Sequence, residues 1–440
     1  MFGRRSRARR NKRERPKLAA PWTSTTKDLK AKGLLHAPLH AVVGPFSPPP
    51  LSGLSLAIGP PDLFRSIARS GATSRGSTAL VAAMTLSAKA MFEFLIDDVS
   101  TVLGITDEVF ELADAERTAL SGRIGAGIAD LVMDALGYSW RDLAEEVIAV
   151  PGRLADFAYD SGTDVVLAEA KGSISAGASA SGNENRALRA YKGQVDPHIF
   201  TSPPAPRGHA PVGLIAHGYA SSVSGLPGSK SSPPPGNGAD AFLAVAQTDR
   251  STVIAAGGTP PTSGGGLSGV NSPEGEDTAD IASPTPLIAL GNYRAVFRLS
   301  NAPVLVQVIE SFLASPSPTS DSFSQAGAQS FDLYECGGVR FIVGSSPIDD
   351  AIVSMHNQMP DRFFAVAEPA ALSLFSTLQV FSQKGVRDRN QVAIQRMRAI
   401  YSVARRGFVM SPDGLALLER KFATPAGKAV WSPWVYKSLP

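Results

Sequence analysis

The spacing of apolar residues changes near residue 150 and divides the chain into a helical part and a mixed part. Between residues 78 and 136, apolar residues recur with the spacing of helices. Ser77 suits the N-cap of the first helix, and Gly137 suits the residue after the last one. Three helices are expected here. The first spans about 78–103, the second begins near 107, and the third spans about 117–136.

From residue 153 onward, short apolar runs separated by turn residues predict strands. Leu154–Asp160 and Asp164–Lys171 read as two strands joined by the turn Ser161-Gly162-Thr163. A helix is expected over Asn183–Val195, with Asn183 as its cap. Further strands are expected at 212–223 and 241–247.

Stretches rich in Pro, Gly, Ala and Ser predict the boundaries between regions. The C-terminal part alternates helical windows with strand-like ones, and the chain has no internal repeat. Its helical windows are 294–313, 369–381 and 390–404, and its strand-like windows are 339–343 and 407–418. The expected organisation is a basic disordered arm (1–17), a Pro/Ala-rich extended segment with one short helix (18–75), a helical lead-in with a core domain (76–255), a Gly/Pro-rich linker (256–285) and a mixed α/β domain of unknown role (286–440).

Composition excludes several classes of protein. Of the 440 residues, 43% are hydrophobic and 18% are charged, which is enough apolar material for a core and excludes wholesale disorder. The single cysteine, Cys336, excludes an internal disulfide and a thiolate metal site, so a reducing, cytoplasmic setting is expected. The most apolar window, 78–96, is interrupted by Lys89 and Glu93, so no membrane span is expected.

Positive charge is concentrated at the N-terminus, although the whole chain carries only +3. The basic side chains within residues 1–17 are so close together that they repel one another, and this segment lacks apolar periodicity. Both features predict a disordered arm. Such an arm binds nucleic-acid phosphates by displacing counterions, and the alternative is a solvated terminus without that role. The basic side chains are Arg4, Arg5, Arg7, Arg9, Arg10, Lys12, Arg13, Arg15 and Lys17.

The two strands around residue 162 place charged side chains in one register. If they form a hairpin centred between Gly162 and Thr163, Asp156 lies directly opposite Glu169, with Cβ atoms about 5 Å apart. Lys171 follows two residues later and shares the face of Glu169. Two facing carboxylates repel each other unless a cation lies between them, and Mg²⁺ or Mn²⁺ is the expected cofactor.

Two alternatives remain open at this point. The triplet Glu419-Arg420-Lys421 has the same spacing, but Asp413-Gly414 before it reads as the turn of a separate hairpin. The set of Asp156, Glu169 and Lys171 also fits an ordinary charged hairpin in which Lys171 pairs with Glu169.

These residues and their setting resemble the PD-(D/E)xK, or restriction-endonuclease-like, nuclease superfamily over about residues 115–250. The resemblance implies an α/β fold with an α-β-β-β-α-β core and Mg²⁺-dependent hydrolysis of phosphodiester bonds in nucleic acid, DNA before RNA. It makes Asp156 and Glu169 metal ligands and Lys171 the catalytic lysine. The chain departs from the pattern at Ala155, where many members have proline. The activity would be that of an endonuclease or exonuclease.

The helix after the motif adds further candidates. Many members of the superfamily place a Gln, Lys or Tyr there, so the resemblance offers Gln194, Lys192 and Tyr191 as catalytic candidates, and Gln194 fits best because it lies near the end of the helix. Arg186, Arg189 and Lys192 on the same helix are candidates for phosphate contacts, or else form a solvated basic face. The alternative function is a non-catalytic nucleic-acid-binding or virion assembly protein with an Arg-rich arm.

The arm is expected to contribute salt-sensitive affinity for nucleic acid. Each lost phosphate contact removes about 0.9 from the slope of log affinity against log salt on duplex DNA. Deletion of residues 1–17 should therefore flatten that slope, measured by fluorescence anisotropy with labelled DNA. An unchanged slope would show that the arm does not touch nucleic acid.

Overall fold

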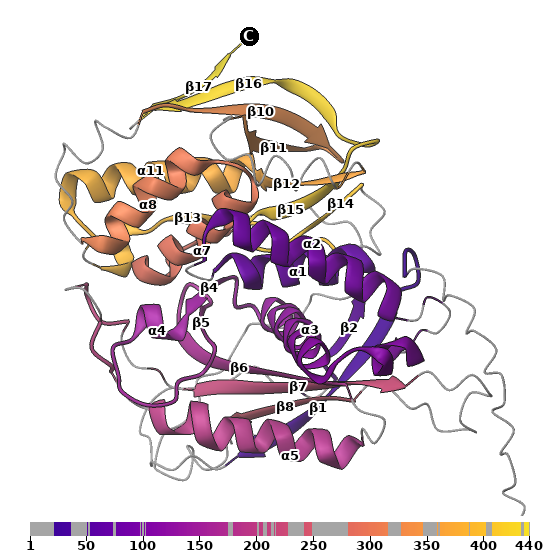
Figure 1. Cartoon of the computed structure of the whole chain (residues 1–440). Helices are drawn as coiled ribbons and strands as arrows, with labels where there is room; N and C mark the ends of the chain where they lie inside the picture. The colour runs from indigo at the N-terminus through magenta and orange to yellow at the C-terminus, as the bar shows by residue number, and fades with distance from the viewer. Residues whose placement is uncertain are drawn as a thin grey trace, which may run out of the picture.

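The chain folds around two β-sheets with helices between and around them (Figure 1). The computed structural model describes residues 22–36, 51, 53–73, 76–96, 98, 101, 103–174, 179–199, 202–205, 209–212, 215, 217–227, 242–248, 280–315, 327–345, 359, 361–386, 388–401, 407–432 and 435–439. The fold is mixed α/β. Among these residues no helix is long and apolar enough to cross a membrane.

The eight-stranded sheet contains all the strands of the N-terminal part. Its order is β2-β1-β8-β7-β6-β5-β4, and β3 pairs with β7 outside this path. Figure 1 shows α3 on one face of this sheet and α5 on the other. The strands are β1 (Lys27–His36), β2 (Ser55–Ile58), β3 (Gly104–Ile105), β4 (Trp140–Leu143), β5 (Phe157–Asp160), β6 (Val165–Ile174), β7 (His217–Pro227) and β8 (Phe242–Thr248).

Helices of the N-terminal part lie mainly on the α3 side of this sheet. The helix α1 packs against both α2 and α3, and α3 packs against β6. The helices are α1 (Pro60–Ala72), α2 (Thr78–Leu95), η1 (Asp107–Glu111), α3 (Asp114–Ala135), α4 (Ala144–Val147), α5 (Ala180–Ala190), η2 (Tyr191–Val195) and η3 (Asp196–His198).

Between α3 and β7 the elements follow the order α3-β4-β5-β6-α5-β7. The strands β4, β5 and β6 form an antiparallel meander. After α5 the chain returns to place β7 parallel to β6. The polypeptide crosses from one face of the sheet to the other here, because α3 and α5 lie on opposite faces.

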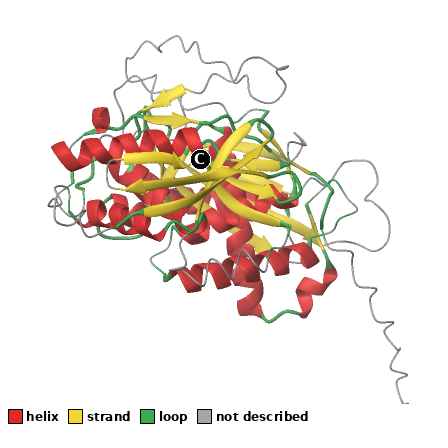
Figure 2. Cartoon of the chain, turned by 90° about the horizontal axis from the view of Figure 1, so that it is seen from above, coloured by secondary structure: helices red, strands yellow, loops and turns green. Residues whose placement is uncertain are grey.

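The C-terminal part forms a seven-stranded antiparallel sheet with α7, α8 and α11 beside it (Figures 1 and 2). The order is β14-β15-β12-β11-β10-β16-β17, and β9 pairs separately with β13. The elements are β9 (Asp280–Ala282), α7 (Pro286–Leu299), α8 (Pro303–Ala314), β10 (Gln329–Cys336), β11 (Val339–Gly344), β12 (Arg362–Ala367), α11 (Glu368–Lys384), η5 (Arg389–Gln391), β13 (Ile394–Arg396), β14 (Phe408–Met410), β15 (Leu415–Glu419), β16 (Thr424–Ser432) and β17 (Val435–Leu439).

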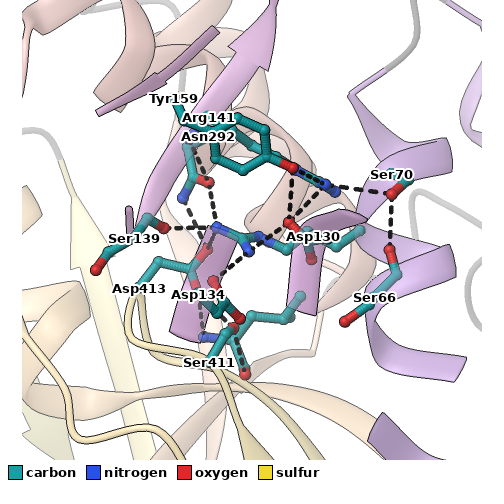
Figure 3. A network of polar contacts seen from close by, with 12 residues as sticks. Ser66, Ser70, Asp130, Asp134, Ser139, Arg141, Tyr159, Asn292, Ser411 and Asp413 are labelled. Carbon is teal, nitrogen blue, oxygen red and sulfur yellow. Dashed lines mark hydrogen bonds and ion pairs between the residues drawn. The ribbon is translucent and has the colours of Figure 1, made fainter. Parts of the chain in front are cut away.

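A buried polar network joins the two parts of the chain (Figure 3), and Arg69 makes its central ion pairs. Arg69 on α1 lies 3.0 Å from Asp130 and 3.2 Å from Asp134, both on α3. Its other terminal nitrogen lies 3.0 Å from Asp413, in the turn between β14 and β15. The same nitrogen donates to Asn292 on α7, whose amide in turn donates to Asp413.

The network also extends into the strands of the first sheet. Arg141 on β4 lies 2.6 Å from Asp130, and the hydroxyl of Tyr159 on β5 donates to the same carboxylate. Burial alone would lower the pKa of Arg69, but the facing carboxylates Asp130, Asp413 and Asp134 raise it. Burial raises the pKa of Asp134 to about 7, even though Arg69 opposes that shift.

Several expected elements differ from those observed. Residues 18–75 do not form an extended segment with one short helix: where they are described, they contribute β1, β2 and the longer helix α1. The window 294–313 is two helices rather than one, because Asn301 adopts a φ of 58° and Pro303 begins α8. The window 390–404 is not a helix where it is described: η5 and β13 replace it, and the N–H of Gln395 on β13 donates to the hydroxyl of Ser373.

Replacing Arg69 should destabilise the whole fold. Arg69→Met leaves three buried carboxylates without their shared cation, which should lower the free energy of unfolding by about 3–5 kcal/mol. Denaturant unfolding measures the loss. The matched control is Arg117→Ala, because Arg117 pairs with the exposed Asp114 and should cost less than about 1 kcal/mol. Equal losses in the two variants would contradict a structural role for the network.

Candidate active site

The hairpin of β5 and β6 adopts the register expected from the sequence. Phe157 pairs with Ala168, and Asp160 pairs with Val165, so the register stays the same along the whole hairpin. Gly162 has a φ of 95°, a left-handed conformation that a glycine adopts without strain in this tight turn. The next pair outward from Phe157 and Ala168 is Asp156 and Glu169.

The two carboxylates lie against each other's backbone. The N–H of Asp156 donates to Oε2 of Glu169 at 2.9 Å, and the N–H of Ala170 donates to Oδ2 of Asp156 at 3.0 Å. Lys171 donates to the other oxygen of Glu169. Each carboxylate is therefore fixed by one backbone hydrogen bond, and the three charged groups form one cluster.

Exposure differs sharply between the members of this cluster. The Glu169 side chain is fully buried, the Asp156 residue is exposed, and the Lys171 side chain is 35% exposed. The pKa of Glu169 is raised to about 7: burial has the largest effect, the nearby charge of Asp156 adds to it, and Lys171 offsets part of the rise. A second cation at this position would therefore stabilise the charged form of Glu169.

The donor set suits a hard divalent cation that keeps most of its water. Within the described part of the chain, no group of three or more His, Cys, Asp or Glu side chains gathers as metal ligands. Two carboxylates are nevertheless a normal protein contribution for Mg²⁺, which takes its other ligands from water and substrate phosphate. Asp156 and Glu169 are the residues that would hold it.

Gln194 reaches the same hairpin from the helix that follows it. It lies in η2, a single π-helical turn that continues α5, and wide turns of this kind are often found at functional sites. Its amide nitrogen donates to the backbone carbonyl of Leu154 at 3.1 Å, two residues before Asp156. Asp156, Glu169 and Lys171 thus form one cluster, and Gln194 contacts the chain two residues before it.

The predicted phosphate contacts divide into three groups. Arg186 on α5 is partly buried, whereas Arg189 and Lys192 are exposed on the same helix and its continuation. The arm residues lie outside the described part of the chain; they are Arg4, Arg5, Arg7, Arg9, Arg10 and Arg13.

Sequence reasoning missed a polar cluster next to Lys171. Asn183, expected to cap its helix, instead lies inside it: the cap is Ser179, whose hydroxyl accepts from the N–H of Gly182. The side chain of Asn183 is buried against β7, where it accepts from Ser222 and Ser224. The available signal was the alternation of these two serines along one strand face.

Two other polar residues lie away from the site. His217 on β7 pairs with Val166, and this puts it on the opposite face of the sheet from Glu169. There it lies 2.6 Å from the Tyr138 hydroxyl, and burial lowers its pKa to about 3. Asp130 on α3 belongs to the Arg69 network.

The rival triplet 419–421 lacks the carboxylate pair. Lys421 lies 3.2 Å from Glu419, as a strand-face ion pair would. The residue opposite Glu419 on β12 is Arg362, a cation where the first site has Asp156. The negative charge of Glu419 is therefore compensated by Arg362 and Lys421, and no second carboxylate faces it that a metal ion would have to neutralise.

Divalent-cation binding should depend on both members of the pair. Glu169→Gln keeps an acceptor for the Asp156 N–H but removes the charge, so calorimetric titration with Mn²⁺ should lose a site that the wild type has. Asp156→Ala should lose it as well. Glu419→Gln is the matched control and should titrate as the wild type does. A site retained in both Glu169→Gln and Asp156→Ala would rule out this pair as the ligands.

Comparison with protein-family models, with curated proteins and with solved structures finds no match to this chain. The candidate site consists of the carboxylates of Asp156 and Glu169, which lie against each other's backbone, and the adjacent Lys171.

Proposed function

We propose that this chain is a divalent-metal-dependent nuclease, a hydrolase that cleaves phosphodiester bonds in nucleic acid, with DNA as the favoured substrate. The observation that carries the proposal is that Asp156 and Glu169 lie against each other just beyond the last strand pair of the hairpin, Phe157 and Ala168, with Lys171 on the same strand face as Glu169. The raised pKa of Glu169 supports it, because the fold keeps an unfavourable charge pair there.

The order of elements around this hairpin supports a PD-(D/E)xK type of core. The sequence α3-β4-β5-β6-α5-β7 has the α-β-β-β-α-β order that the resemblance implies. Within it, β4, β5 and β6 form an antiparallel meander, and β7 is parallel to β6. Asp156 immediately precedes the second strand of that order, and Glu169 and Lys171 lie on the third.

Each residue has a separate task under this proposal. Asp156 and Glu169 hold Mg²⁺ or Mn²⁺, and a cation bound there polarises a phosphoryl oxygen and lowers the pKa of a bound water. Lys171 lowers the pKa of Glu169 and so favours its charged form, and it presents a positive charge to the phosphate as negative charge develops on it. Gln194 holds the Leu154 backbone and so fixes the approach to Asp156.

The competing function is that of a non-catalytic nucleic-acid-binding or assembly protein. One observation favours it: Lys171 already binds Glu169, as it would on an ordinary charged strand face. Under that reading the hairpin is structural, and the basic arm supplies the affinity for nucleic acid. Cleavage of plasmid, single-stranded DNA and RNA with Mg²⁺, Mn²⁺ or EDTA separates the two functions.

Lys171→Ala should lower the cleavage rate by a few orders of magnitude while nucleic-acid affinity stays nearly unchanged. The physical reason is that its charge is needed more in the transition state than in substrate binding. Single-turnover cleavage of labelled DNA measures the rate, and circular dichroism monitors the fold.

Asp156→Ala is the informative comparison. It should abolish cleavage through loss of the cation, and raised Mn²⁺ should partly restore activity there but not in Lys171→Ala. If Lys171→Ala cleaves at the wild-type rate, or only unfolds, Lys171 is a structural partner of Glu169 and the nuclease proposal fails.

A further inference from the structure

A polar band continues from Lys171 along the same face of the sheet. Side chains alternate between faces, so Glu169, Lys171 and Ser173 on β6 share one face. The parallel register pairs Lys171 with Ser222 and Ser173 with Ser224 on β7. The helix α5 packs against β7 on this face.

Arg186 on α5 is fixed at the far end of this band by neutral acceptors. Its Nη1 lies 3.3 Å from the Ser224 hydroxyl and 3.4 Å from Oδ1 of Asn183. Asn183 is itself anchored, since its amide nitrogen donates to the Ser222 carbonyl at 2.6 Å and its Oδ1 accepts from both serine hydroxyls. The guanidinium is therefore held in position without an ion pair.

The charge of Arg186 is left uncompensated. Among the described residues no carboxylate forms an ion pair with it, and the nearest acid along α5, Glu184, pairs with Lys32 at 2.7 Å. By contrast, the buried Arg294 lies 3.4 Å from Asp142, and the partly buried Arg389 lies 2.9 Å from Asp160. Burial lowers the pKa of Arg186, and the neighbouring Arg189 lowers it further, so an anion would relieve both effects.

We propose that Arg186 binds the phosphodiester next to the one that reacts. This rests on the proposed function, because the reacting phosphate is taken to lie at Asp156, Glu169 and Lys171. Ser173 and Ser224 lie two residues further along the strands than Lys171 and Ser222, a span of about 7 Å. Arg186 thus marks the side on which the polynucleotide continues, and the ligand is a chain of phosphates rather than one phosphate ester. The planar guanidinium of Arg186, already held in position, suits a phosphate better than the mobile ammonium group of a lysine would.

The test measures binding without turnover. The full-length protein is titrated with labelled duplex and single-stranded DNA in EDTA at several salt concentrations, and fluorescence anisotropy reports affinity. Arg186→Ala should weaken binding about tenfold or more, as loss of one charge-assisted contact does. The salt slope should fall by about 0.9 on duplex and about 0.7 on single strands.

Three further variants make the result specific to Arg186. Arg186→Gln keeps an amide donor for Asn183 and Ser224 but loses the charge, so it should bind as weakly as Arg186→Ala, and it replaces that variant if the alanine protein fails to fold. Arg186→Lys should recover the salt slope but only part of the affinity. Arg189→Ala removes the same charge from an exposed position one turn away and should lose less.

The inference is overturned if Arg186→Gln binds as the wild type does, or if it loses no more than Arg189→Ala. Cleavage in Mg²⁺ is measured separately on the same proteins. A wild type that shows the Arg186 effect on binding but never cleaves would remove the nuclease proposal and leave the phosphate contact standing. A wild type that cleaves, with Arg186→Gln binding normally, would remove only the phosphate contact.

Discussion

The guanidinium of Arg69 binds three buried aspartates, two from α3 and one from the turn between β14 and β15. Removing charges from water is expensive, so these groups are stable inside the protein only while all of them stay together. The partners come from both sides of the stretch 256–285. The two sheets are therefore tied by a contact that neither part can satisfy alone, and the apolar core that surrounds it is continuous across them.

The same network reaches the candidate site through the backbone of one strand. Tyr159 and Arg141 bind Asp130, and the Arg141 guanidinium lies 5.1 Å from the ring centre of Phe157. Phe157 is the neighbour of Asp156. Rigid support of this kind matters at a site where two carboxylates face each other, because mutual repulsion would otherwise move the exposed one away. The C-terminal part thus has a physical connection to the hairpin, although the four predicted catalytic positions all lie in the N-terminal part.

Local signals predicted the hairpin well and the distant contacts poorly. A short turn containing Gly162, flanked by two apolar runs, determines a register, and that register put Asp156 opposite Glu169. No local pattern reveals that Arg69 meets Asp413, that Asn183 turns inward to Ser222, or that residues 31–36 pair with 243–248, because these contacts join segments far apart in the sequence. The sequence contains Asn301 and Pro303 where α7 and α8 separate, but the continuous apolar pattern on both sides favoured a single helix.

The pairing of β1 with β8 has a consequence for the order in which the molecule assembles. During synthesis β1 leaves the ribosome early, while β8, its parallel neighbour, follows only after the whole meander, α5 and β7. Until then one edge of β1 has β2 as its partner and the other edge has none from this sheet. Long-range parallel pairing of this kind folds slowly and leaves strand edges open to other chains. Lys30 and Lys32 on β1 are exposed. Charged residues of this kind on a strand edge oppose pairing with another copy of the chain until β8 has been synthesised.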